Sequence, residues 1–404
     1  MLYINIVLGI MLLITELVLY RLDKYSNKMV FVSFTILLVP FYSVIIFFDT
    51  RIIQSYLVFD TFELDLLSYM IFVVLLLGVN ISALFMNTVK IKKARYESEY
   101  STQFISFSFY VTAVLSILAF LVNYIRVLSI GGIEVLFINP RLYELTFGAN
   151  SVINYIYFLN VPSLIFLLLK KRYGYIKKID LLIALVLVLI SIFHGIKFTI
   201  FDTVIIPALF SILSLNKSNK INLSKYFKLF TPMIGVFLVF NQFVRGSSGK
   251  LTEAFLGYIL PSYVNLLYSV SIEPVSFNFV LKLFWPSLIQ YPLTDISIMN
   301  PVGFMLNPKY NMPTGILIMY ETFNYLGLIF IPLILMLISK FLMKNRHKNI
   351  VYMFTNTMFH YCLLFLFWSW SFTKIKYIYY VVFFILWSFS HSVITRSKKI
   401  RLFK

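Results

Sequence analysis

The stretch from Met1 to Tyr20 reads MLYINIVLGIMLLITELVLY, and Glu16 is its only charged residue. A helix needs about 20 mostly apolar residues to cross the hydrocarbon core of a bilayer, so this run is long enough to span it. No basic segment precedes the run and no small-residue cleavage site ends it, and its first basic residues, Arg21 and Lys24, come after it. We therefore expect a retained first membrane span with its N-terminus outside.

Runs of this kind recur along the whole chain. Of its 404 residues, 60% are hydrophobic and 13% are charged, whereas about 25% of the residues of a typical soluble protein are charged. The pattern predicts an all-α polytopic integral membrane protein that forms one domain over residues 1–404, with eleven spans. The expected spans are 1–20, 29–48, 64–87, 104–126, 151–169, 179–194, 199–215, 229–244, 314–339, 350–368 and 377–394.

Connections rich in Lys and Arg alternate along the chain with connections that contain few of them. One side holds 25 of the 35 basic residues, in segments 21–28, 90–95, 170–178, 217–228, 340–348 and 396–404. Short cytoplasmic loops retain basic residues during insertion, so we expect this side and the C-terminus to be cytoplasmic. The formal net charge of +19 then reflects membrane topology and attraction to anionic headgroups rather than nucleic-acid binding.

The sequence contains none of the common motifs for nucleotide or cofactor chemistry. No phosphate-binding loop, dinucleotide fingerprint, HExxH or GxSxG pattern occurs. Cys362 is the only cysteine and the four histidines are scattered, which argues against a disulfide framework and against a zinc site. We therefore expect no cofactor and no metal.

Three connections on the outer side are longer than a turn, and the first of them is acidic. It covers residues 49–65, DTRIIQSYLVFDTFELD, and ends in Glu63 and Asp65. Such a pair can hold a divalent ion or act as a general base. The simpler interpretation is that it caps the next helix, whose dipole favours negative charge at its start.

The other two outer connections are the ones in which a substrate site is expected. Residues 129–150, SIGGIEVLFINPRLYELTFGAN, combine a Gly-Gly turn, an apolar stretch and Arg141. Residues 245–313 form a large extracytoplasmic loop, whose aromatic residues suit either sugar rings or the membrane interface. Within it, EAFLGYILPSYVNLLYSV at 253–270 is predicted to lie along the outer leaflet as an amphipathic helix.

Ionisable residues in or beside the predicted spans need a partner or a cavity, because each costs about 2.5 to 3.5 kcal/mol on insertion scales. They are Glu16, Lys197, Asp202 and Glu321. Lys197 and Asp202 are five residues apart and can form a structural ion pair. Glu321 lies about 12 Å into a span that begins at Pro313, so it should face a polar cavity.

Residues 313–332, PTGILIMYETFNYLGLIFIP, resemble the segment that follows the large periplasmic loop of Wzy-type O-antigen and capsular polysaccharide polymerases. The shared features are a proline-rich start, Glu321, aromatic residues, and Gly327 six positions after the glutamate. GGIEVLFINPRLYE at 131–144 resembles the Gly-Gly, apolar, Arg arrangement of an earlier loop in that family. HGIKF at 194–198 is similar to its Gly-x-Arg, with Lys197 in place of the arginine, which weakens a bidentate role.

The resemblance implies a GT-C-like glycosyltransferase in the bacterial cytoplasmic (inner) membrane. Such an enzyme polymerises undecaprenyl-diphosphate-linked oligosaccharide repeat units on the outer face, with a chain-length regulator as a partner and without nucleic acid. The implied catalytic residues are Glu321, Arg245 and Arg141, and the implied substrate-binding residues are Lys197, Lys250, Glu253, Glu144, Tyr258 and Tyr320. The cations would stabilise the leaving diphosphate. Glu321, Glu253 or Glu144 would act as the base, or Glu321 would instead orient an arginine.

Two alternative functions remain open at this point. An O-antigen ligase would transfer finished glycan to a lipid core, but ligases of that kind usually carry a functional histidine in the large outer loop, and residues 245–313 contain none. A flippase or transporter for lipid-linked oligosaccharides would line its path with intramembrane charges.

Overall fold

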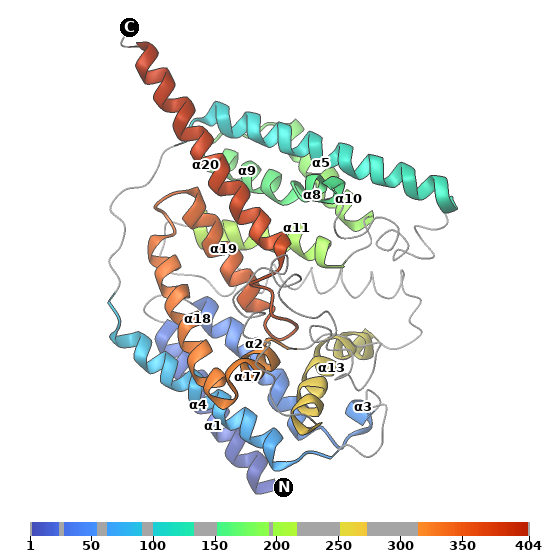
Figure 1. Cartoon of the computed structure of the whole chain (residues 1–404), viewed down its shortest axis with the longest axis vertical. Helices are drawn as coiled ribbons and strands as arrows, with labels where there is room; N and C mark the ends of the chain where they lie inside the picture. Colours follow the sequence, from blue (N-terminus) through green and yellow to red (C-terminus); the bar gives the residue numbers. More distant parts are fainter. Residues whose placement is uncertain are drawn as a thin grey trace.

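The computed structural model describes residues 2–23, 28–54, 63–90, 100–132, 152–193, 197–215, 251–272 and 314–402, and every regular element in these ranges is a helix (Figure 1). Seven helical stretches within them are long and apolar enough to cross a membrane: Tyr3–Arg21, Met29–Ile46, Leu66–Thr88, Thr102–Ser129, Val152–Arg172, Tyr325–Asn345 and Ile375–Ile394. The chain is therefore an all-helical, membrane-embedded protein.

Most of the predicted spans in these ranges correspond to single helices. They are α1 (Leu2–Asp23), α2 (Lys28–Ile46), α4 (Leu66–Thr88), α5 (Thr102–Gly131), α10 (Lys178–Phe193), α19 (Ile350–Leu364) and α20 (Ile375–Leu402). A short helix, α3 (Arg51–Gln54), lies between α2 and α4. The span expected at 229–244 lies outside the described residues, so the total of eleven stays a prediction.

Three predicted spans are instead divided. In the first two, the regular α-helix is interrupted near a proline, which lacks the backbone N–H that a continuous helix uses as a donor. They are α8 (Val152–Tyr157) with α9 (Asn160–Arg172), and α11 (Lys197–Leu209) with the π-helical turn η1 (Phe210–Leu215). The third, expected at 314–339, consists of α17 (Gly315–Phe323) and α18 (Tyr325–Asn345).

The helices pack in two groups, the lower and upper parts of Figure 1. The first core contains α1, α2, α4, α13 (Leu251–Ile272), α17 and α18. The second contains α5, α8, α9, α10, α11, η1 and α20. α19 joins the two groups, because it packs against α2 and α18 on one side and against α11 and α20 on the other.

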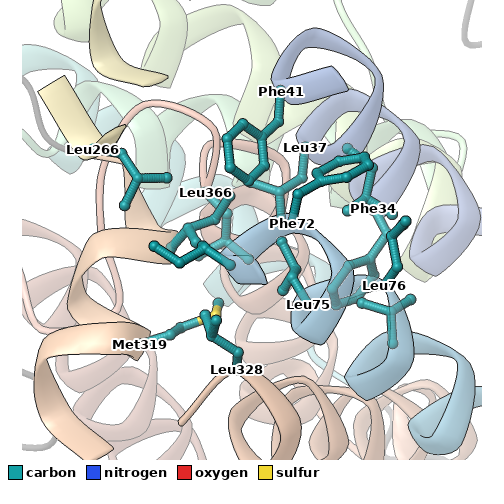
Figure 2. Close-up of a cluster of buried hydrophobic side chains, with 14 of the residues drawn as sticks. Phe34, Leu37, Phe41, Phe72, Leu75, Leu76, Leu266, Met319, Leu328 and Leu366 are labelled. Carbon is teal, nitrogen blue, oxygen red and sulfur yellow. The ribbon is translucent and has the colours of Figure 1, made fainter. Parts of the chain in front are cut away.

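Aromatic and aliphatic side chains from distant parts of the sequence form the centre of the first core (Figure 2). Phe41 of α2 meets the ring of Phe72 of α4 edge to face, with centroids 5.1 Å apart. Phe41 also stacks on Tyr263 of α13 at 5.4 Å. Each such pair contributes about 0.5 to 1.5 kcal/mol beyond the area that it buries.

The position of α13 corrects one prediction. Residues 260–267 of this helix are buried on all sides, so it does not lie along the outer leaflet. The Tyr263 hydroxyl donates to the carbonyl of Leu37 in α2 (2.7 Å). A helix that is apolar all round is a core helix rather than an interfacial one, and this segment has too few polar residues to form a wet face.

Hydrogen bonds between helix ends gather several connections at one end of the molecule. The Tyr100 hydroxyl, just before α5, accepts from the backbone N–H of Ile350 at the start of α19 (2.8 Å). Lys340 near the end of α18 donates to the carbonyl of Val89 after α4 (2.6 Å), and His391 of α20 accepts from the N–H of Ser101 (3.1 Å). The basic segment 340–348 therefore lies beside the residues that flank the connection between α4 and α5, as the charge pattern predicts.

The acidic residues before α4 have the simpler of their two predicted roles. The Asp65 carboxylate accepts from the N–H of Ser68 (2.9 Å) and from its hydroxyl (2.8 Å), so it caps α4. Glu63 is exposed. Within the ranges that the structure describes, no group of three or more His, Cys, Asp or Glu side chains could hold a metal ion.

Candidate functional site

The ten residues between α19 and α20, FLFWSWSFTK at 365–374, form a non-helical segment that is nevertheless largely buried. We call it the α19–α20 segment. Buried backbone outside a helix needs hydrogen-bond partners from elsewhere. The carbonyl of Leu366 accepts from the N–H of Gly315 (2.7 Å), and the carbonyl of Phe367 accepts from the hydroxyl of Ser262 (3.1 Å). The segment thereby joins α17 and α13.

Gly315 allows α17 to begin directly against this segment. A Cβ atom at this position would lie 2.7 Å from Leu366 Cδ2 and 3.1 Å from its carbonyl oxygen, closer than atoms normally pack. The preceding Thr314 caps the helix, because its side chain accepts from the N–H of Leu317 (3.3 Å). The start of α17 is thus placed both by its cap and by the α19–α20 segment.

α17 carries Glu321 into the interior, where only 9% of the glutamate is exposed. All residues from Gly315 to Thr322 are buried. Glu321 therefore lies on a short helix surrounded by protein rather than partway along a continuous span. The prediction of one span over 314–339 is wrong, and the prediction that Glu321 faces a polar cavity stays a prediction.

The chain reverses at Asn324, immediately after α17. Asn324 has φ 56° and ψ −143°, a conformation that non-glycine residues rarely adopt. Its side-chain oxygen accepts from the N–H of Tyr325 (2.8 Å), which caps α18. At Gly327 a Cβ atom would lie 1.9 Å from the carbonyl oxygen of Met319. Only glycine lets α18 fold back against α17 at this distance.

Tyr320 lies beside this turn. It is buried, and its ring meets that of Tyr325 edge to face with centroids 5.5 Å apart. Because Tyr320 precedes Glu321 in the same helix, the two side chains point in different directions around the helix axis. Tyr320 therefore serves the packing of α17 on α18.

A second cluster lies where α11, α19 and the start of α20 meet. Asp202 of α11 is fully buried. Its carboxylate accepts from the hydroxyls of Tyr361 (2.5 Å) and Tyr377 (3.3 Å) and forms an ion pair with Lys376. The side chain of Lys197, the predicted partner, lies outside the described residues, so that pairing stays a prediction, whereas Lys376 comes from a much more distant part of the chain.

Lys374, at the end of the α19–α20 segment, adds a second cation to this cluster. Its ammonium group donates to the Ser369 hydroxyl (3.0 Å) and lies 4.9 Å from the ring centroid of Phe198 in α11. Lys376 likewise lies 4.3 Å from the ring centroid of Phe158. Burial lowers the pKa of Lys374; Cys362 and Asp202 partly offset this by raising it, and the charge of Lys376 lowers it slightly.

A third group of charged residues contains one buried positive charge and one buried negative charge. Lys170 of α9 and Asp180 of α10 form an ion pair of 2.7 Å in which the two side chains are 2% and 0% exposed. Asp180 also accepts from the Tyr110 hydroxyl (2.7 Å) and from the N–H of Lys177 (2.8 Å). One carboxylate matches one buried cation here, which is the composition of a structural tie.

Polar side chains continue from the Asp202 cluster into the second core. The amide nitrogen of Asn160 donates to the hydroxyls of Ser191 (3.0 Å) and Thr203 (2.9 Å). The Tyr157 hydroxyl donates to Ser191 (3.3 Å). These contacts bind α8, α9, α10 and α11 together next to Asp202, and interhelical hydrogen bonds of this kind hold apolar helices in register.

The predicted site residues fall into three groups. Glu321 and Tyr320 are buried in α17. Lys197 is the first residue of α11, and Glu253 and Tyr258 belong to α13. Arg141, Glu144, Arg245 and Lys250 lie outside the described residues. The α19–α20 segment is what connects the first two groups, since it contacts α17, α13 and α11.

Sequence reasoning passed over the α19–α20 segment, Lys374 and Lys376. The charge pattern places the two lysines on the outer side and indicates no further role for them. Tyr361 and Tyr377 lie in predicted spans, where nothing in the sequence marks them as partners of a carboxylate. One signal was present: two lysines beside the start of a span on the side where basic residues are scarce. The chain matches no protein-family model, no curated protein and no solved structure.

Proposed function

We propose that this chain is a GT-C-like membrane glycosyltransferase that polymerises polyprenyl-diphosphate-linked oligosaccharide repeat units into O-antigen or capsular polysaccharide. The reaction takes place on the outer face of the cytoplasmic membrane. One observation carries the proposal. The segment that resembles the polymerases forms a buried turn between two helices. Gly327 allows the close contact between these helices, and Glu321 lies inside the protein.

The position of α17 supports this function. A continuous span would hold Glu321 against its neighbouring helices, whereas a short helix ended by a reversal brings it to a junction. The α19–α20 segment ties that junction to α13, which belongs to the predicted large outer loop, and to α11. A membrane enzyme acting on a lipid headgroup needs such a convergence of elements near one face of the bundle.

The chemistry of the reaction agrees with the residues present. The glycosyl diphosphate bond already stores the energy of transfer, so no nucleotide is required. As this bond breaks, negative charge grows on the departing diphosphate and cations stabilise it. A cationic hydrogen bond of about 2 kcal/mol that forms only in the transition state raises the rate about 30-fold. The acceptor hydroxyl loses its proton to a carboxylate, for which Glu321 is the first candidate.

The proposal is tested with purified protein in proteoliposomes supplied with polyprenyl-diphosphate repeat units. A ladder of longer lipid-linked glycans supports a polymerase. Transfer of glycan to a lipid core supports a ligase, and transbilayer movement without lengthening supports a transporter; either result without a ladder refutes the proposal. Glu321→Gln should reduce chain growth by at least about 100-fold if Glu321 is the base. The matched control is Glu63→Gln, which changes an exposed glutamate.

A further inference from the structure

The Asp202 cluster holds more positive charge than its carboxylate balances. Lys374 and Lys376 both approach it, and among the described side chains Asp202 forms an ion pair with Lys376. Among the described residues, no carboxylate lies within ion-pair distance of Lys374, which donates to the neutral Ser369 hydroxyl. Two tyrosine hydroxyls already satisfy the other carboxylate oxygen of Asp202.

Comparison with the Lys170–Asp180 pair shows that the excess of positive charge is particular to the Asp202 cluster. There, one lysine and one aspartate are both inaccessible and their charges cancel. In the Asp202 cluster, the Lys376 side chain is 18% exposed while Asp202 is buried. Lys376 is thus the more accessible member of the ion pair, and the carboxylate lies behind it.

The surroundings of the lysines suit a negatively charged ligand. Each ammonium group rests on an aromatic face, Lys374 on Phe198 and Lys376 on Phe158, which holds the cations in place without neutralising them. A desolvated cation without a counter-charge is costly, and a bound anion would remove that cost.

We infer that Lys374 and Lys376 form a binding site for a diphosphate group, which in this membrane protein is the headgroup of the lipid-linked substrate. The identification of the lipid rests on the proposed function, whereas the anion site rests on the cluster itself. Asp202 acts as a positioning residue, because it holds Lys376 and is separated from the ligand by it. Burial lowers the pKa of Lys374 although the charge of Asp202 raises it, so this carboxylate does not fully offset the burial of the ammonium group.

The test measures the binding of three probes to the full chain in detergent micelles: inorganic pyrophosphate, farnesyl diphosphate and phosphatidylglycerol. Lys374→Gln should weaken the binding of both diphosphates at least about tenfold, equivalent to about 1.4 kcal/mol. Lys374→Arg should retain binding because the charge remains. Lys178→Gln is the matched control, since Lys178 is an exposed lysine that also begins a helix. The Tm of each variant shows whether it is folded.

Each outcome separates the anion site from the polymerase proposal. Unchanged diphosphate affinity in folded Lys374→Gln overturns the site, even if the wild-type protein polymerises. Phosphatidylglycerol binding as strongly as farnesyl diphosphate also overturns it, because the cluster would then be a general lipid-headgroup contact. Loss of diphosphate binding in Lys374→Gln supports the site, and it does so even if the wild-type protein yields no glycan ladder, a result that would refute the polymerase alone.

Discussion

Gly327→Ala tests whether α17 and α18 contact each other as closely as the structure shows. The added Cβ atom would lie 1.9 Å from the carbonyl oxygen of Met319. Carbon and oxygen atoms in close contact are about 3.3 Å apart, so α17 and α18 would have to separate by about 1.4 Å. The clash is with backbone, which no rotamer change can relieve.

The energetic consequence follows from two opposing terms. Replacing glycine by alanine inside a helix normally stabilises the fold by about 0.5 to 1 kcal/mol. Forcing extra atoms into a packed interior costs about 1 to 3 kcal/mol and sometimes more. Because the obstructing atom here is backbone, we expect the steric cost to exceed about 3 kcal/mol. After the gain from alanine is subtracted, the free energy of unfolding should fall by at least about 2 kcal/mol.

Activity should respond more strongly than stability. Met319 lies two residues before Glu321 in α17, so a displacement of the helix also displaces the glutamate. A misplacement of about 1 Å at a reacting group can reduce the rate about 100-fold. The assays are the Tm in detergent and chain growth in proteoliposomes. The reaction should therefore slow about 100-fold in protein that still inserts into the membrane.

Gly9→Ala is the matched control, because its Cβ atom would meet only the end of the Tyr42 side chain, at 2.6 Å. Tyr42 can swing away and lose its hydrogen bond to the Asn5 carbonyl, which costs about 1 kcal/mol. Chain growth should be unchanged in this control. A Gly327→Ala protein with wild-type Tm and activity would refute the close contact between α17 and α18.

The remaining predictions concern the charged residues. Asp202→Asn should destabilise the protein by about 3 kcal/mol, the lower end of the range for a buried pair, because it leaves the partly exposed Lys376 without its counter-charge; a Tm equal to that of the wild type would contradict the pairing. Arg141→Ala and Arg245→Ala should each abolish chain growth without preventing membrane insertion, and full activity in either variant would remove that arginine from the diphosphate role. Diphosphate binding should weaken as the pH rises, starting below the usual lysine range, because only protonated Lys374 attracts the anion and burial lowers its pKa. Lys374→Arg should abolish this pH dependence, since arginine stays charged; a pH profile identical to that of the wild type would point to another group.

Several features of the fold could be predicted from the sequence because they depend on local composition. Long apolar runs must be helical in a bilayer, where no water is available to the backbone. Asp65 could be recognised as a cap from its place before an apolar run. The basic segments identified connections that share one end of the molecule. For the same reason Glu321 could be singled out, since a carboxylate in an apolar run needs a special environment.

Other features were out of reach because they depend on contacts between distant residues. The burial of α13 depends on which helices surround it. The reversal at Asn324 depends on whether α18 can approach α17, which Gly327 permits only in the presence of the Met319 carbonyl. Asp202 pairs with Lys376, far away in sequence, because α11 and the start of α20 meet in the fold.

The sequence by itself determined that the chain is a helical membrane protein, and it marked Glu321 as a buried acid, since both follow from the cost of exposing polar groups to hydrocarbon. The tertiary structure alone decided which cation neutralises Asp202 and which one, Lys374, is left over. The reason is physical: the free energy of a buried charge depends on its distance to other charges in space, and separation along the chain does not specify that distance.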